Sequence, residues 1–210
     1  MKKYTPLITI LATLVSTEAI TVSTGFNTTD GFTQGGTADV TLNNAVTFSG
    51  GQQQQGFLQS AYDQGPAAYL FINSGPGFNG ATSTGDTGAI SFGLQGATNV
   101  TFFAANLANG PGAGIISVFG LNNNLLGTED VLSGSFTNNG DNSDFEISLD
   151  ATTFGENIGS IEFNLPGPAD TPNPPYVVSI DTFNATVVPE PTSAALLGLG
   201  LGFSIFRRRR

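Results

Sequence analysis

Residues 89–104 read Ala-Ile-Ser-Phe-Gly-Leu-Gln-Gly-Ala-Thr-Asn-Val-Thr-Phe-Phe-Ala and indicate the fold class more clearly than any other part of the chain. Apolar side chains stand at every second position in two sets: Ile90, Phe92 and Leu94, then Val100, Phe102 and Ala104. This alternation is typical of half-buried β-strands, because successive side chains of a strand point to opposite faces. The stretch therefore predicts two consecutive strands joined by a turn.

The same alternation recurs along the chain. It appears in Phe145, Ile147 and Leu149 and in Ile161, Phe163 and Leu165, with weaker strand candidates at residues 40–48, 69–73 and 114–120. Polar or glycine-rich stretches are interpreted as loops: Gly50–Gly56 with its glutamines Gln52–Gln55, Gly75–Gly88 and Gly167–Pro175. About nine or ten strands separated by turns predict an all-β fold, a single β-sandwich of the jelly-roll type.

A change of face is visible in the last strand before the C-terminal segment. Tyr176, Val178 and Ile180 share one parity, whereas Phe183, Ala185 and Val187 share the other. A β-bulge near Asp181 and Thr182 would restore one continuous inward face, because a bulge inserts one extra residue into a strand. The sequence predicts such a bulge.

The charges are distributed unevenly. All basic residues lie at the two ends of the chain: Lys2, Lys3, Arg207, Arg208, Arg209 and Arg210. Of the 16 acidic residues only Glu18 and Glu190 lie outside residues 20–188, which leaves that part with 14 carboxylates and no Lys, Arg or His. Such a domain cannot neutralise phosphates, which excludes nucleic acid as a partner and electrostatic docking on anionic lipid. Its carboxylates must be solvated, hydrogen-bonded or matched by an external cation.

Few catalytic systems are compatible with this composition. The absence of cysteine and histidine excludes serine-histidine and cysteine-histidine nucleophiles and the usual zinc sites. Paired carboxylates, as used in glycoside hydrolysis, remain, and Glu146 and Glu162 are the candidates. Both alternate with apolar residues, which favours the alternative interpretation of a solvated outer face. We therefore expect no enzymatic activity.

Oxygen-rich side chains gather at residues 138–144, which include Asp141 and Asp144. Calcium prefers several oxygen ligands, and Asp181 would join such a metal site if the bulge turned it outward. The spacing does not match an EF-hand loop, and Asn and Asp also favour turns because they cap their own backbone. Calcium is therefore one hypothesis and an ordinary turn is the other.

Aromatic residues could serve as platforms for sugar rings in a jelly-roll domain. The chain has no tryptophan, and Tyr69 and Tyr176 lie in apolar runs, where core packing is the simpler interpretation. Tyr62 lies in a loop-like stretch, which makes it the candidate ligand-binding residue.

The N-terminus has the layout of a secretory signal peptide. Lys2 and Lys3 precede an apolar stretch at residues 7–15, and the small-residue site Thr17-Glu18-Ala19 follows. This order predicts a signal peptide over residues 1–19 that is cleaved after Ala19, whereas an uncleaved anchor or a buried strand is the alternative.

The C-terminus combines three elements in a fixed order. Val188-Pro189-Glu190-Pro191 precedes an apolar run at residues 192–206, and the chain ends with the basic cluster Arg207, Arg208, Arg209 and Arg210. A helix of that run is roughly 22 Å long, which is short for a hydrocarbon core of about 30 Å. The four arginines would hold its far end on the cytoplasmic side of a membrane. This segment suits a processed anchor better than a permanent span.

This tail resembles the PEP-CTERM sorting signal. The resemblance implies export across the inner membrane of a Gram-negative-type bacterium, recognition by an exosortase at Pro-Glu-Pro, and release to the cell surface or the extracellular exopolysaccharide matrix. It implies nothing about the activity of the cargo. We expect a sandwich domain at residues 20–187 and the sorting signal at 188–210. The expected role is structural or interactive, as in a biofilm matrix, and the alternative is a calcium-assisted polysaccharide-binding module.

Overall fold

The computed structural model describes residues 18–55, 67–73, 87–106, 115–130, 145–165 and 176–189. Residues Ala19–Pro189 form one compact unit. Of the predicted signal peptide, Glu18 and Ala19 are described. Several other predictions fall outside the described residues: the rest of the signal peptide, the apolar run at 192–206, the basic cluster Arg207, Arg208, Arg209 and Arg210, and the candidate site residues Tyr62, Asp141 and Asp144.

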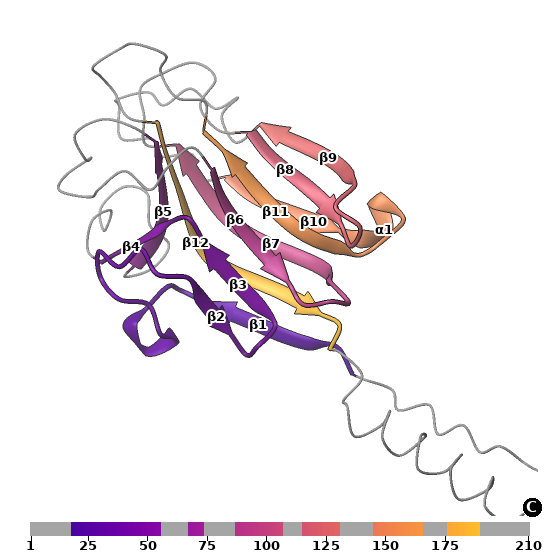
Figure 1. The fold of residues 1–210 in the computed structure, drawn as a ribbon, viewed down its shortest axis with the longest axis horizontal. Helices are drawn as coiled ribbons and strands as arrows, with labels where there is room; N and C mark the ends of the chain where they lie inside the picture. Colours follow the sequence, from indigo (N-terminus) through magenta and orange to yellow (C-terminus); the bar gives the residue numbers. More distant parts are fainter. Residues whose placement is uncertain are drawn as a thin grey trace, which may run out of the picture. The chain divides into compact units, whose positions relative to one another are not determined.

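The described elements are almost all strands (Figure 1). They are β1 (Ile20–Thr24), β2 (Val40–Leu42), β3 (Val46–Ser49), β4 (Gln52–Gln55), β5 (Ala67–Asn73), β6 (Thr87–Phe92), β7 (Ala97–Asn106), β8 (Ile115–Gly120), β9 (Leu125–Asp130), β10 (Phe145–Asp150), β11 (Ile158–Asn164) and β12 (Tyr176–Val187). A 3-10 turn, η1 (Thr28–Asp30), and a one-turn helix, α1 (Ala151–Phe154), complete the set. This content confirms the all-β prediction.

The strands pair antiparallel in two layers. One layer has the order β4-β5-β12-β7-β10. Strand β12 is long: on the edge opposite β7, its first half pairs with β5 and its second half pairs with β1. The other layer has the order β2-β3-β6-β11-β8-β9. A single residue pair, Ile158 with Ala97, joins β11 to β7.

The topology is that of a jelly roll. From β5 to β12 the chain crosses repeatedly between the layers, so that β5-β12-β7-β10 face β6-β11-β8-β9. Eight strands in two four-stranded sheets connected in this way define the jelly-roll sandwich, and this prediction is confirmed. The remaining four strands extend the layers at β12, β5 and β6.

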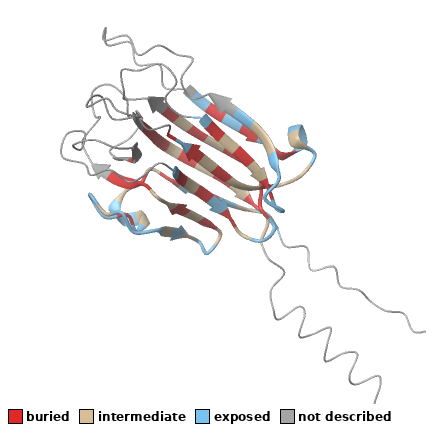
Figure 2. Ribbon diagram, turned by 45° about the horizontal axis from the view of Figure 1, so that its top comes forward, coloured by how far each residue is buried: buried red, intermediate tan, exposed pale blue. Residues whose placement is uncertain are grey.

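One hydrophobic core lies between the layers. Buried and less buried residues alternate along the strands, as Figure 2 shows and as period-two patterning requires. Aromatic rings link the layers: Phe102 and Phe183 from β7 and β12 pack on Phe163 and Phe48 from β11 and β3. The predicted apolar strand faces therefore form a shared core that needs no disulfide.

The predicted β-bulge is present in β12. Three steps along β12 from Asp181 to Asn184 match two steps along β7 from Phe103 to Thr101, so one residue is extra. Thr182 adopts a left-handed φ of 47° there. Ile180 and Phe183 are both buried on the core side, which confirms that the bulge restores a continuous inward face.

Two local predictions are wrong. Leu94 does not continue the inward face of β6, because a tight turn at Gly93–Gly96 reverses the chain and leaves the leucine 76% exposed. Gln52–Gln55 is not a polar loop but strand β4. Gln52 and Gln53 are buried there because their side-chain amides donate to the carbonyls of Gly35 and Phe26, at 2.9 and 3.1 Å.

Candidate functional site

The folded domain holds the chain up to the first residue of the predicted sorting signal. Ile20 pairs with Val187, so the first and last strands meet at one end of the sandwich. Val187 is buried, and the amide of Val188 donates to the carbonyl oxygen of Gly96 at 3.0 Å. The motif Pro189-Glu190-Pro191 therefore begins one residue beyond the last contact with the turn.

The structure describes two of the eight predicted sorting residues, Val188 and Pro189. The other six lie outside the described residues: Glu190, Pro191, Arg207, Arg208, Arg209 and Arg210. Their proposed roles in recognition and membrane orientation therefore rest on the sequence.

The turn that accepts the hydrogen bond from Val188 is closely packed. Gly96 has φ of 70°, and a Cβ there would lie 2.6 Å from the carbonyl oxygen of Ile158 and 2.8 Å from Cδ2 of Leu121. Asn157 donates to the carbonyl of Gln95 at 2.8 Å. The sequence identified a turn here, but nothing in the sequence pattern indicated that this turn fastens the exit of the chain.

Asp181 is buried rather than turned outward to solvent. Its exposed fraction is 2%, and its Oδ1 accepts a hydrogen bond from the amide of Thr182 at 2.6 Å. By register it pairs with Phe103 on the outer side of the layer, where Ser179 is also buried. At the bulge this carboxylate is therefore buried and not exposed to solvent.

The other two predicted calcium ligands, Asp141 and Asp144, lie outside the described residues, but the residue that follows Asp144 is described. Phe145 follows Asp144, and it pairs with Ala104, which pairs with Ile180. Two strand spacings, about 10 Å, therefore separate the start of β10 from the strand that carries Asp181. The described ranges contain no group of three acidic, histidine or cysteine side chains that could hold a metal ion.

The two carboxylates considered for catalysis are on different layers. Glu146 on β10 is exposed and stands beside the buried Ile147, so it points away from the core. Glu162 on β11 lies between the buried Ile161 and Phe163 and points outward from the opposite layer. Two carboxyl groups on opposite outer faces cannot flank one glycosidic bond.

Tyr69 belongs to the core and is not a surface platform. It is 1% exposed, and its ring lies 5.7 Å, between centroids, from those of Phe26, Phe32 and Phe48. The hydroxyl oxygen accepts a hydrogen bond from the Gly51 amide at 3.2 Å.

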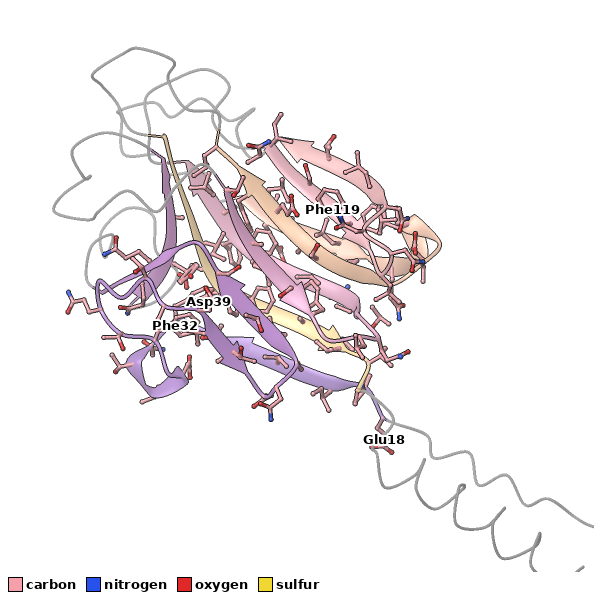
Figure 3. All side chains as sticks on the ribbon, in the orientation of Figure 1. Glu18, Phe32, Asp39 and Phe119 are labelled. Carbon is pink, nitrogen blue, oxygen red and sulfur yellow. The ribbon has the colours of Figure 1, made fainter. Side chains whose placement is uncertain are left out.

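Burial raises the pKa of Tyr69 to about 12, and Asp39 adds to the rise. Phe32 and Asp39, labelled in Figure 3, come from the segment between β1 and β2.

The membrane-spanning segment predicted at residues 192–206 is not among the described residues. Within the part of the chain that the structure describes, no helix has the length and hydropathy needed to cross a membrane. For Tyr176, at the start of β12, only the backbone is described.

Comparison with known proteins identifies the C-terminal segment. Residues 187–210 match the PEP-CTERM protein-sorting motif, so the predicted motif is present, and it implies an exported, sorted protein that an exosortase processes. No curated protein matches the chain. Among solved structures, the K2 cleaved adhesin domain of Lys-gingipain (Kgp) is similar at 13% identity and a TM-score of 0.47, over 80% of this chain and 98% of that one.

Proposed function

We propose that this chain is a surface or exopolysaccharide-matrix protein with a structural or interaction role, delivered by its C-terminal motif. The observation that carries the proposal is the matched motif at residues 187–210, which starts at the last residue of the last strand. The domain at residues 20–187 is the cargo, and residues 188–210 are the sorting signal.

The chemistry of the tail supports a transient anchor. The run at residues 192–206 has the apolar character to enter a bilayer but is short for a span, and Gly198, Gly200 and Gly202 weaken its helix. Proline has no amide hydrogen to donate and disfavours helical backbone in the residue before it, so Pro189 and Pro191 favour an extended backbone at Glu190. An extended segment just outside the membrane is a suitable substrate for a membrane-embedded processing enzyme.

The sorting role is tested by expressing the full chain in a bacterium that has an exosortase, with an internal epitope tag. The unchanged chain should accumulate at the cell surface or in the matrix with a reduced mass. The variant Glu190→Ala should remain in the membrane fraction with its C-terminal segment uncleaved, as should the unchanged chain in a strain without the enzyme. Glu162→Ala is the matched control, because it removes one carboxylate far from the motif in sequence. Equal processing of both variants would contradict the proposal.

A structural or interaction role, rather than a catalytic one, is supported by the positions of the carboxylates. Glu146 is exposed and Glu162 is half-buried, and the two point outward from opposite layers. A domain with 14 carboxylates and no basic side chain remains soluble at high local concentration, because its copies repel one another. This property suits a component of a hydrated polysaccharide matrix.

The alternative is a polysaccharide-binding module assisted by calcium. It is favoured by one observation: the register places the strand that carries Asp181 about 10 Å from the residue that follows Asp144. Calcium bound by Asp141, Asp144 and Asp181 would compensate negative charge at the place where β10 begins. Tyr62 remains the proposed sugar contact.

Co-sedimentation with the exopolysaccharide of the producing organism separates the two roles. Saturable binding that requires calcium and is lost in Tyr62→Ala or Asp144→Asn would establish the binding module. Asp150→Asn is the matched control, because this exposed aspartate at the end of β10 caps α1 and lies outside the proposed site. Absence of binding with and without calcium would leave the structural role.

A further inference from the structure

Exposed leucines gather at the end of the sandwich from which the chain leaves toward the sorting motif. Leu94 in the β6–β7 turn is 76% exposed, Leu121 in the β8–β9 turn 43%, and Leu125 at the start of β9 58%. We call these three residues the leucine end. Among the described residues one other large apolar side chain is exposed, Ile115, and it lies at the opposite end of β8. Within the part of the chain that the structure describes, three of the four exposed large apolar side chains therefore lie at one end.

Direct contacts join the leucine end to the exit of the chain. A Cβ on Gly96 would meet Leu121, so this leucine lies on the turn that also carries Leu94. The same glycine accepts the hydrogen bond from Val188. Glu18, labelled in Figure 3, marks where the chain enters the domain at this end.

The length of the connecting chain limits how far this end can lie from a membrane. Only residues 189–191 separate Val188 from the apolar run that begins at Thr192. Four steps of at most about 3.6 Å span about 14 Å. The polar interfacial region of a bilayer is itself roughly 6 Å thick on each side. Insertion of the apolar run would therefore hold the turn that is bonded to Val188 beside the lipid headgroups.

We propose that the leucine end rests on the non-cytoplasmic surface of the bilayer while the tail is inserted, with Leu94 and Leu121 in the headgroup region. The inference rests on the proposed anchoring of residues 192–206. A lipid surface is the occupant because the tether brings it within reach and because leucines enter the interface without needing a cation. The domain has no basic side chain, so the contact is apolar and not electrostatic.

The chain contains no tryptophan, so a single introduced tryptophan reports its own surroundings. The full chain is prepared as Leu94→Trp and, as the matched control, as Ile115→Trp, and each is incorporated into phosphatidylcholine nanodiscs. Both positions replace an exposed apolar side chain, one at each end of the sandwich. Tryptophan emission is then compared between nanodiscs with ordinary and with brominated acyl chains. Far-UV circular dichroism verifies that both variants are folded.

For Leu94→Trp we expect the tryptophan emission maximum to lie at shorter wavelength than for Ile115→Trp. We also expect the Leu94→Trp emission to be weaker in brominated than in ordinary lipid, whereas that of Ile115→Trp should be the same in both. Equal emission of the two variants in brominated lipid would overturn the inference, since the domain would then have no preferred face toward the membrane. That result would also be found if the leucine end were reserved for a protein partner. Failure of the chain to co-purify with nanodiscs would instead overturn the proposed anchoring and, with it, the inference. The two failures are therefore distinguishable.

Discussion

Alkaline pH should destabilise this domain through Tyr69. The buried hydroxyl has a pKa of about 12, against 10.0 when exposed, so the unfolded chain releases this proton at lower pH than the folded one. A raised pKa in the folded state means that the contribution of Tyr69 is complete below pH 10 and is lost as the pH rises toward 12. From these two values the loss is about 1 kcal/mol at pH 11 and about 2 kcal/mol at pH 12.

Comparison with Tyr69→Phe isolates this effect. Phenylalanine keeps the ring contacts but leaves the buried Gly51 amide without its acceptor, so the variant should be less stable by about 1–3 kcal/mol at pH 8. The free energy of unfolding is measured by urea titration with far-UV circular dichroism between pH 8 and pH 12. The difference in the free energy of unfolding between the two proteins should shrink, or change sign, by the amounts given above as the pH rises from 8 to 12. A gap independent of pH would refute the assignment of Tyr69 to the core.

Three further predictions concern local features of the fold. Gly51→Ala would drive a methyl group into the ring of Tyr69 and should cost about 1–3 kcal/mol or more in urea titration, whereas Gly155→Ala meets no atom and should cost only the strain of its positive φ. Thr182→Gly relieves a left-handed β-branched residue and should raise the free energy of unfolding by about 1 kcal/mol; a clear loss would show that its side chain matters more than its backbone. Asp150 accepts hydrogen bonds at the start of α1, which lower its pKa, so the unchanged protein should lose stability below about pH 4. The Asp150→Asn profile should be flatter there, and parallel profiles would contradict the capping role.

Much of the fold could be predicted because the chain repeats one simple pattern. Alternation identified β6, β7, β10, β11 and β12, and the change of parity after Ile180 identified the bulge. Strand β4 could not be predicted, because its four glutamines carry no apolar alternation. The burial of Gln52 and Gln53 depends on the carbonyls of Gly35 and Phe26, which are distant in sequence. Strands β1 and β9 were also missed, because each has only two apolar side chains and therefore no clear alternation.

The sorting motif could be predicted for a different reason from the fold. It is a linear signal, which a processing enzyme reads from a few consecutive residues, so the sequence contains all of it. The fastening of Val188 to Gly96 is a contact between residues far apart in the chain, and only the fold reveals it. Asp181 shows the same limit: the sequence placed it at the bulge but could not tell that it is covered.

The position of β12 determines how the domain carries mechanical load. This strand is flanked along its length by β7 on one side and by β5 and then β1 on the other, and it leads directly into the tail. A pull between the tail and the far end of the sandwich runs along β12, so its hydrogen bonds, which are perpendicular to the strand, are loaded together in shear. A pull that separates Ile20 from Val187 instead opens β1 from β12 one pair at a time. The domain should therefore resist unfolding by a force applied along β12 through the tail better than by a force that pulls its two chain ends apart.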